Sequence, residues 1–470
     1  MAAITLAKLL RQIKIETSDE REIFGISDDS RIVQKDWLFI ARKGTKQNGA
    51  DYAAQAIAKG AVVLWEGENK ENCYHCEDII RAQSIILRAY YGDPSRHLQV
   101  IGVTGTNAKT SVSDILAQLL TYMKYQVMVI GTGAVRFLDQ EIAIDNTTPS
   151  ACVLGYFFHQ ALLHGISTII MEVSSHAIDQ SRIGFIRFDA VIYTNIASDH
   201  LDYHITRTHY QYTKLKLRKY LKRNGILIVN HDDASLHPLY SFHDHKVVTV
   251  GQNQAHFQIS AVKLKAAGSS FMLQNTRYEM NLLGIHNVYN AAQCLVVLHE
   301  MNVSPKIRQA SVKQLHPVSG RMEIHKLNHS YAIIDYAHTA SSLAALLQTV
   351  NQLKEHNMLV ICGCGGDRDR SKRKEMAEIA MRYADTVIFT TDNPRSEPPY
   401  QILYDMIHGL KGNYEIFENR ACAIKYAVKI AQDHDIIVIA GKGNENYQTF
   451  NGKKYPFSDQ EALRRALEEN

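Results

Sequence analysis

The sequence predicts an α/β protein of three domains whose strands form parallel sheets. Its 470 residues suffice for about three domains of ~100–200 residues each. Short apolar runs alternate with longer amphipathic stretches, which indicates parallel strands covered by helices. A polar loop carrying a lysine, residues 105–111, joins one apolar run to an amphipathic stretch and predicts a central sheet domain of the P-loop ATPase-like kind.

The first predicted domain covers residues 1–97. Short strands are expected at residues 37–40 and 61–64, where apolar side chains run together, with helical stretches between them. Pro94 breaks the chain before the next strand, so we expect the domain to end there.

The second predicted domain covers residues 98–317. A buried strand is expected at 98–103, then the phosphate loop, then a helix with one apolar face. That face consists of Val112, Ile115, Leu116, Leu119 and Leu120. Further strands are expected at 126–130, 168–171 and 190–193. Short alternating strands follow within 246–282, and a helix is expected near 287–301.

The third predicted domain covers residues 318–470 and begins after His316-Pro317. Its expected strands lie at 331–334, 358–362, 386–390 and 435–440, with helical segments between them. This alternation again predicts a parallel sheet. The chain shows no internal repeat and no low-complexity tract.

The composition is that of a globular protein and argues against several classes of partner. The net charge of +4, from 52 basic and 48 acidic residues, does not favour binding to nucleic acid or to a membrane surface. Seven scattered cysteines do not form a secreted disulfide framework. No signal peptide or long apolar run is evident, so a cytoplasmic protein is expected. Cys73 and Cys76 suggest either half of a zinc site or, more in keeping with their isolation, a loop or core pair.

The phosphate loop has the groups needed to bind a nucleoside triphosphate. Backbone N–H groups at a helix N-terminus, the Lys109 ammonium and the Thr110 hydroxyl together suit a polyphosphate and its magnesium. The strict pattern has glycines where this chain has Val103 and Ala108. An ordinary strand-to-helix turn is therefore the alternative.

Polar groups also follow the next predicted strands of the second domain. Glu172 and His176 come after one of them, at the strand end where open α/β sheets bind ligands. His200, Asp202 and His204 alternate after another, which suggests a zinc centre or a magnesium-linked role. Lys214 lies on a predicted helix, and spacing does not distinguish it from Lys216, so it is expected at the surface.

Three glycine-bearing polar loops follow successive strands of the third domain. They are Gly363 to Arg370, Asp392 to Glu397 and Gly441 to Glu445. Loops at the carboxyl ends of parallel strands converge on one crevice. The guanidinium groups of Arg368 and Arg395 are suited to the carboxylates of a small zwitterion.

These motifs, taken in order, resemble those of the Mur ligases of peptidoglycan synthesis. The resemblance covers almost the whole chain and rests on many short collinear motifs. They are Asp29-Ser-Arg31, the phosphate loop, Asn146-Thr-Thr-Pro149, Glu172-Val-Ser-Ser-His176, Asp199-His-Leu-Asp202, Tyr210-x-x-x-Lys214, His286-Asn-Val-Tyr-Asn290, Gly320-Arg-Met-Glu323, Asp335-Tyr-Ala-His-Thr339, Gly365-Gly-Asp-Arg368, Asp392-Asn-Pro-Arg395 and Gly441-Lys-Gly-x-Glu445.

The resemblance implies an ATP-dependent acid–amino-acid ligase of cell-wall biogenesis. By this resemblance the first domain holds a UDP sugar, the central one ATP, and a Rossmann-like third one the incoming amino acid. The expected reaction adds meso-diaminopimelate to UDP-MurNAc-L-Ala-D-Glu through an acyl phosphate, in a cytoplasmic monomer. Alternatives are the same ligase acting on L-lysine, a folylpolyglutamate synthetase-like ligase, and a non-catalytic nucleotide-binding relative.

The resemblance also assigns residues to the ligands. ATP is assigned to Gly105, Thr106, Asn107, Ala108, Lys109, Thr110, Ser111, Asn287, Asn290, Arg321 and Asp335. The UDP moiety is assigned to Ser30, Thr45, Lys46 and Gln47, and the muramoyl-dipeptide to Asn146, Thr147, Thr148, Ser174, Gln180 and Arg182. The amino acid is assigned to Arg368, Asp392, Asn393, Pro394, Arg395, Gly441 and Glu445.

The catalytic group implied by the resemblance is Lys109, Glu172, His200 and Lys214. Two magnesium ions are expected on Thr110, Glu172, His200 and Lys214, with Lys214 carrying a carbamate formed from carbon dioxide. This role overturns the expectation of a surface lysine. The chain departs from the family pattern at Asn48, Ala108, Ala340 and Asn444, and none of these changes removes a group that the chemistry requires.

Overall fold

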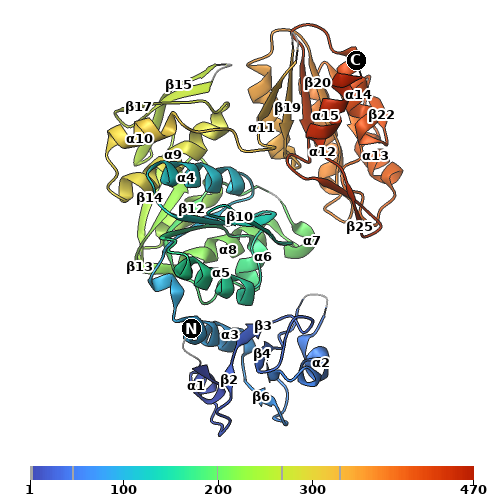
Figure 1. Cartoon of the computed structure of the whole chain (residues 1–470). Coiled ribbons are helices and arrows are strands. Elements are labelled where there is room, and N and C mark those ends of the chain that lie inside the picture. Colours follow the sequence, from blue (N-terminus) through green and yellow to red (C-terminus); the bar gives the residue numbers. More distant parts are fainter. Residues whose placement is uncertain (1–3, 45–46, 198, 266–267, 328–329, 470) are drawn as a thin grey trace.

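The computed structural model describes residues 4–44, 47–197, 199–265, 268–327 and 330–469. Figure 1 shows three lobes arranged in chain order, from the blue N-terminal lobe through the green central lobe to the red C-terminal lobe. Over these described ranges, the strands form three main sheets, one in each lobe. No helix in the same ranges combines the length and apolar character needed to cross a membrane.

The N-terminal lobe holds a small parallel sheet in the order β3-β4-β5-β6. Strands β4 and β5 lie at the two predicted places. Cys73 and Cys76 are buried free thiols, which confirms the core interpretation for this pair. The elements are β1 (Ile4–Thr5), α1 (Leu6–Arg11), β2 (Glu22–Ile23), β3 (Gly25–Ser27), β4 (Trp37–Ile40), η1 (Gly49–Tyr52), α2 (Ala53–Ala58), β5 (Val62–Trp65), β6 (Cys73–His75), α3 (Ile79–Tyr91) and η2 (Pro94–Arg96).

The central lobe is built on a long mixed sheet in the order β10-β9-β8-β11-β7-β12-β13-β14-β15-β16-β17. Its first elements are β7 (Gln99–Thr104), α4 (Lys109–Tyr122), β8 (Val127–Gly131), β9 (Ala134–Phe137), β10 (Gln140–Ala143), α5 (Ala151–Leu163), β11 (Thr168–Glu172), α6 (Ser175–Asp179) and β12 (Phe188–Tyr193). They are followed by α7 (Leu201–His204), α8 (Arg207–Leu215), η3 (Lys216–Tyr220), β13 (Leu221–Asn230), η4 (Ala234–Ser241), β14 (Lys246–Gly251), β15 (Phe257–Lys265), β16 (Gly268–Leu273), β17 (Thr276–Met280), α9 (Ile285–Glu300) and α10 (Pro305–Val312).

The parallel arrangement predicted for this sheet is confirmed from β8 to β14. The two edges differ, because β9 and β10 form an antiparallel hairpin, and β15, β16 and β17 pair antiparallel. The short alternating strands predicted within 246–282 are confirmed as β14 to β17, whereas the hairpin of β9 and β10 was not predicted. The predicted apolar face of α4 is confirmed, as all five of its side chains are buried.

The C-terminal lobe has a sheet in the order β18-β19-β23-β20-β21-β22, in which only the edge strand β18 pairs antiparallel. Apolar clusters fill both faces of this sheet. The elements are β18 (Glu323–Lys326), β19 (Tyr331–Asp335), α11 (Ala340–Asn351), β20 (Met358–Cys362), α12 (Ser371–Tyr383), β21 (Thr386–Thr390), α13 (Pro399–Ile407), β22 (Glu415–Phe417), α14 (Arg420–Ile430), β23 (Ile436–Ala440), β24 (Tyr447–Phe450), β25 (Lys453–Pro456) and α15 (Asp459–Glu468).

Candidate active site

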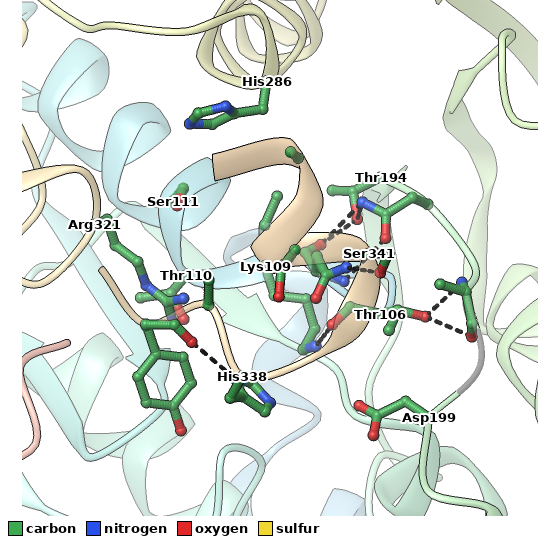
Figure 2. Close-up of a pocket in the computed structure, with 18 of the residues that line it drawn as sticks. Thr106, Lys109, Thr110, Ser111, Thr194, Asp199, His286, Arg321, His338 and Ser341 are labelled. Atoms are coloured by element: carbon green, nitrogen blue, oxygen red, sulfur yellow. Dashed lines mark hydrogen bonds between the residues drawn. The ribbon is translucent and has the colours of Figure 1, made fainter. Parts of the chain in front are cut away.

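A cavity of about 620 Å³ lies between the strand ends of the central sheet and the loops of the C-terminal lobe. Figure 2 shows residues of both lobes around it, including Lys109 and Thr110 from one and Arg321 and His338 from the other. Most of the predicted ATP, metal and amino-acid residues line it: Thr106, Asn107, Ala108, Lys109, Thr110, Ser111, Glu172, His200, Asn287, Asn290, Arg321, Asp335, Arg368, Asp392, Asn393, Arg395 and Glu445. Thr147, predicted for the muramoyl-dipeptide, lines it as well.

The phosphate loop joins β7 to α4 and forms one wall of this cavity. Gly105 has a φ of +157°, and a Cβ atom there would lie 1.8 Å from Thr194 Oγ1, so only glycine fits. Ala108 adopts a left-handed φ of +67°, a region that costs an L-residue roughly 1–2 kcal/mol. The loop therefore has the phosphate-binding geometry, with strain where the usual pattern has glycine.

Lys109 is the first residue of α4, and its ammonium folds back over the loop. Its Nζ donates to the carbonyl oxygens of Gly105 and Thr106, each at 2.9 Å. Burial lowers the pKa of Lys109, although the nearby carboxylates of Glu172 and Asp199 act in the opposite direction. The lysine is thus placed at the loop that would hold the phosphates.

Glu172 ends β11 and is buried with its carboxylate beside α4. Thr110 Oγ1 donates to Glu172 Oε1 at 3.0 Å, and the Thr132 amide donates to the same oxygen at 3.0 Å. Burial raises the pKa of Glu172, against the lowering effect of Lys109. The structure therefore brings together the hydroxyl and the carboxylate that the sequence predicted for magnesium.

Lys214 is buried beneath the phosphate loop, so the expectation of a surface lysine from spacing alone is wrong. Its Nζ donates at 2.8 Å to the Gly105 carbonyl, which also accepts from Lys109. The adjacent Tyr210 on α8 has its ring under the ammonium, and its hydroxyl lies 3.0 Å from Thr106 Oγ1. Burial, reinforced by the Lys109 charge, holds the pKa of Lys214 well below its usual value, which favours a neutral amine.

His200 lies next to Asp199 at the cavity wall. Its Nε2 is 3.5 Å from Asp199 Oδ2, and burial lowers its pKa. The rings of His176 and His200 are 4.9 Å apart, whereas His204 is fully buried. No group of three or more His, Cys, Asp or Glu side chains in the described part of the chain is placed to hold a metal ion, so the alternating His200, Asp202 and His204 form no zinc centre.

The residues around Glu172 fit magnesium in part. A hydroxyl and a carboxylate are oxygen ligands of the kind that Mg²⁺ prefers, and Thr110 and Glu172 already lie in contact. An unmodified Lys214 supplies no acceptor, because an amine is not an oxygen ligand. A second ion near His200 and Lys214 therefore fits only if the lysine carries a carboxylate group.

The residues predicted for the muramoyl-dipeptide form a hydrogen-bonded cluster behind Glu172. Arg182 donates through Nη1 to the Thr148 carbonyl at 2.6 Å and through Nη2 to Gln180 Oε1 at 2.7 Å. The Ser174 amide donates to Thr148 Oγ1 at 3.0 Å. Asn146 is exposed beside this cluster.

The residues predicted for the UDP moiety lie in the N-terminal lobe. Ser30 is buried and donates to Gln55 Oε1 at 2.9 Å, while Gln47 is exposed. Thr45 and Lys46 lie outside the described residues. The N-terminal lobe contacts the dipeptide cluster through Arg42, whose Nη2 donates to the Gln180 carbonyl at 2.7 Å.

The predicted nucleotide residues beyond the loop come from α9 and the start of the C-terminal lobe. Asn290 Nδ2 donates to Asn287 Oδ1 at 3.1 Å, and both side chains are buried. The Arg321 guanidinium lies 4.2 Å from the centre of the Tyr336 ring. Asp335 accepts hydrogen bonds from two backbone amides, which fixes its carboxylate at the end of β19.

The predicted amino-acid residues converge from three strand ends of the C-terminal lobe. Asn393 Nδ2 donates to Glu445 Oε2 at 2.8 Å, and Arg395 Nη1 donates to the Gly366 carbonyl at 2.8 Å. Arg368 is exposed and lines the same cavity. Pro394 and Gly441 are buried in the backbone that supports these side chains and do not line the cavity.

Three cavity residues received no role from the sequence although they lie within or beside the recognised motifs. Asp199 precedes His200, and His338 lies in the segment after Asp335; burial lowers the pKa of His338 to about 4. Lys372 Nζ donates to the His338 carbonyl at 3.1 Å. The only available signal was their place in polar loops after strands, which does not separate a wall residue from a solvated one.

Comparisons with known protein families cover most of the chain. The Mur ligase middle domain matches residues 103–298, the glutamate ligase domain of Mur ligases matches residues 320–443, and the Mur ligase family catalytic domain matches residues 22–109.

Individual relatives match over nearly their whole length. The chain is 35% identical to the UDP-N-acetylmuramoyl-L-alanyl-D-glutamate–2,6-diaminopimelate ligase of Listeria innocua, over 98% of each chain. A solved structure of a ligase with that name superposes with a TM-score of 0.72 at 31% identity, covering 99% of each chain. A MurF ligase from Thermotoga maritima in complex with ADP shares the fold, with a TM-score of 0.66 at 16% identity, over 95% of this chain and 97% of the other.

Proposed function

The chain belongs to the Mur ligase family of ATP-dependent amide ligases, and from this premise we propose that it joins meso-diaminopimelate to UDP-MurNAc-L-Ala-D-Glu in peptidoglycan precursor synthesis. One observation carries the proposal. A single cavity is lined by Lys109 of the phosphate loop, by Glu172 and by Arg395 and Glu445 of the C-terminal lobe. A ligase of this kind needs ATP, an acceptor carboxylate and an amine within one such space.

The proposed reaction proceeds in two steps. The γ-phosphoryl group of ATP is transferred to the D-glutamyl carboxylate, which gives an acyl phosphate and ADP. The amine of diaminopimelate then attacks the acyl carbon, the C–N bond forms, inorganic phosphate leaves and the nitrogen loses a proton. The protein contributes mainly positioning and neutralisation of charge.

Particular residues of this chain supply that charge and position. We assign Lys109 and the N-terminus of α4 to the ATP phosphates, with Asn287, Asn290, Arg321 and Asp335 around the nucleotide. Thr110 and Glu172 would hold magnesium, which when bound neutralises phosphate oxygens. His200 belongs to the same wall.

We assign Lys214 as the site of a carbamate formed from carbon dioxide. The reaction needs a neutral amine, whose lone pair attacks the carbon of CO₂ while the nitrogen releases a proton. Burial and the Lys109 charge lower the pKa of Lys214, which favours that neutral form. The product is an anion close to the phosphate loop and can serve as the missing oxygen ligand beside His200.

The remaining ligands are assigned by lobe, and we propose that the lobes are divided between residues 97 and 98 and between residues 317 and 318. The UDP moiety is proposed for the N-terminal lobe, and the dipeptide for the cluster of Thr148, Ser174, Gln180 and Arg182. The amino acid is proposed for the loops around Arg368, Asp392 to Arg395, and Glu445. We further propose that the protein acts as a cytoplasmic monomer.

Arg395 supports diaminopimelate over L-lysine as the amino acid. Its guanidinium would pair with a second carboxylate that lysine lacks, and a hydrogen bond to a charged group contributes about 1.5–3 kcal/mol. A folylpolyglutamate synthetase-like activity is less well supported, because the N-terminal lobe and its contacts to the dipeptide cluster have no role in it. The buried placement of Glu172 and Lys214 argues against a non-catalytic scaffold.

The test is product formation by the purified protein with ATP, magnesium, UDP-MurNAc-L-Ala-D-Glu and one amino acid at a time. We expect ADP release and a nucleotide product whose mass has increased by one diaminopimelate residue. A product containing lysine would establish the first alternative. ADP release that does not depend on the UDP substrate, with no new nucleotide product, would contradict the proposal.

A further inference from the structure

Lys442 is a fully buried lysine beneath the proposed amino-acid pocket. It lies in the loop after β23 and shows 0% exposure. Its Nζ is 3.0 Å from Glu445 Oε2 and 3.6 Å from Asp392 Oδ1. Because a buried ammonium requires compensation, these two carboxylates are the natural counter-charges of Lys442.

The two carboxylates reach the pocket from different strand ends and are tied together there. Asp392 follows β21, Glu445 follows β23, and both line the cavity. Asn393 Nδ2 donates to Asp392 Oδ1 at 3.2 Å and to Glu445 Oε2 at 2.8 Å. Tyr336 donates through its hydroxyl to Glu445 Oε1 at 3.3 Å. Lys442 itself does not line the cavity, so it acts on a ligand only through these acidic groups.

The charges around the pocket match diaminopimelate better than L-lysine. Asp392 and Glu445 carry two negative charges, and Lys442 cancels one of them. Arg368 and Arg395 line the same cavity and carry two positive charges. The pocket therefore offers one net acidic site for one ammonium group and two guanidinium groups for two carboxylates. Diaminopimelate has two carboxylates, and one of its amines remains charged when the other is the nucleophile.

We propose that Lys442 is a specificity-determining positioning residue: by cancelling one of the two acidic charges, it sets the pocket for an amino acid with two carboxylates and disfavours lysine. This inference rests on the proposed function. Without Lys442 neither of the two acidic charges in the pocket would be cancelled. Such a pocket suits a ligand with more cationic charge. L-lysine, with one carboxylate fewer than diaminopimelate, is such a ligand.

The first test is Lys442→Met, which keeps the length of the side chain and removes its charge. We expect the KM for meso-diaminopimelate to rise by about tenfold or more, because truncating one partner of a buried charge pair has a large effect. The KM for ATP should stay near the wild-type value. The ratio of kcat/KM for lysine to that for diaminopimelate should increase. Lys453→Met, at an exposed lysine of the neighbouring β25, is the control and should change none of these values.

The second test restores the charge balance with Lys442→Met/Asp392→Asn. This double variant removes the Lys442 ammonium together with one of its two carboxylates, so it leaves no uncompensated charge pair in the interior. It therefore keeps the test valid if the single variant does not fold. We expect it to recover much of the preference for diaminopimelate. A purely structural role predicts that the double variant is worse than the single one, for both amino acids equally.

The outcomes separate the inference from the proposed function. If wild-type protein prefers diaminopimelate and folded Lys442→Met keeps the same preference and KM, the inference is wrong and the proposed function stands. The inference is also wrong if the double variant loses the preference altogether. If wild-type protein ligates neither amino acid, the proposed function fails and the inference fails with it.

Discussion

At the scale of single residues, the central feature of the molecule is the sharing of one carbonyl oxygen by two lysines. Lys109 and Lys214 both donate to Gly105, at 2.9 Å and 2.8 Å. Two ammonium groups at one acceptor repel each other, and Lys214, the more buried, has its pKa lowered further. The close approach of the two amines at the phosphate loop thus favours the neutral form of Lys214.

The assignment of Lys214 is tested by exchanging it for alanine. We expect Lys214→Ala to lose ligation by roughly 10²-fold or more, the size of effect seen when a preorganised charged group is removed. The matched control is Lys216→Ala on the same stretch, where the lysine lies over the exposed ring of Tyr212 in a cation–π pair. Turnover with ATP, UDP-MurNAc-dipeptide and diaminopimelate is measured, with circular dichroism to verify folding. Equal activity of both variants would refute the role.

The left-handed Ala108 leads to a prediction about stability. We expect Ala108→Gly to stabilise the protein by about 1 kcal/mol, because glycine adopts a φ of +67° without the Cβ penalty. Ala117→Gly, inside α4, is the same chemical change in a right-handed helix and should destabilise by about 1 kcal/mol. Urea unfolding of both variants gives the two free energies. Destabilisation at both positions would show that Ala108 is not strained.

At the scale of secondary-structure elements, α8 holds the lysine in place by contacts at its N-terminus and in its middle. Thr206 caps its N-terminus by accepting from the His209 amide at 3.1 Å, and Tyr210 ties its middle to Thr106. The preceding α7 contributes His204, whose ring contacts those of His176, Tyr203, His209 and Tyr210. Both ring nitrogens of His204 are buried and have no hydrogen-bond partner within the described residues. The helix pair is therefore held by aromatic contacts around a neutral imidazole.

This arrangement predicts a pH-dependent contribution to stability. Burial lowers the pKa of His204 from 6.5 to about 4, so the unfolded chain binds a proton between these values and the folded protein does not. Stability therefore falls as the pH decreases from 6.5 towards 4. We expect His204→Leu to be close to wild type at pH 8 and more stable than wild type at pH 5. Thermal unfolding at the two pH values measures this. If the difference in melting temperature between the variant and wild type were the same at both pH values, the assignment would be contradicted.

At the scale of the whole molecule, the N-terminal and central lobes share an apolar core, and polar contacts beside the binding residues join the lobes as well. Arg42 of the N-terminal lobe donates to the Gln180 carbonyl, and Ser150 of the central lobe donates to Asp28 Oδ1 at 2.8 Å. Across the other junction, Asn107 of the phosphate loop donates to Ser341 Oγ at 3.3 Å. Because each contact involves a loop assigned to a ligand, the relative position of the lobes affects substrate binding directly.

We expect Arg42→Ala to weaken the binding of the UDP substrate without affecting the binding of ATP. A hydrogen bond from a charged donor is worth about 1.5–3 kcal/mol, which corresponds to a rise of roughly tenfold or more in the KM for UDP-MurNAc-dipeptide. The KM for ATP should remain within about twofold, since the residues proposed for the nucleotide lie at the other junction. Arg11→Ala, at an exposed arginine of the same lobe, is the control. Equal increases in both KM values would show a general effect on substrate binding and contradict the specific role.

Much of the fold was predictable from local patterns, because a buried parallel strand needs a continuous apolar run. Strands β4, β20 and β21 lie at their predicted residues. Strand β13 was not predicted, since only its second half, ending at Val229, is an uninterrupted apolar run. The hairpin of β9 and β10 was missed as well, because β10 is exposed along its length and has no apolar pattern to recognise.

The sequence by itself determined the α/β class, the phosphate loop and, through its motifs, the family of ligases. Those features depend on residues that are neighbours along the chain. The motif resemblance singled out Lys214 where spacing could not, and the tertiary structure places it under the loop. Only the tertiary structure decided that Lys442 joins Asp392 to Glu445. Helical periodicity and loop composition do not fix which side of a helix or loop packs against a distant segment of the chain. Burial and charge pairing arise from contacts between residues distant in the sequence, such as Gly105 and Lys214, which are 109 positions apart.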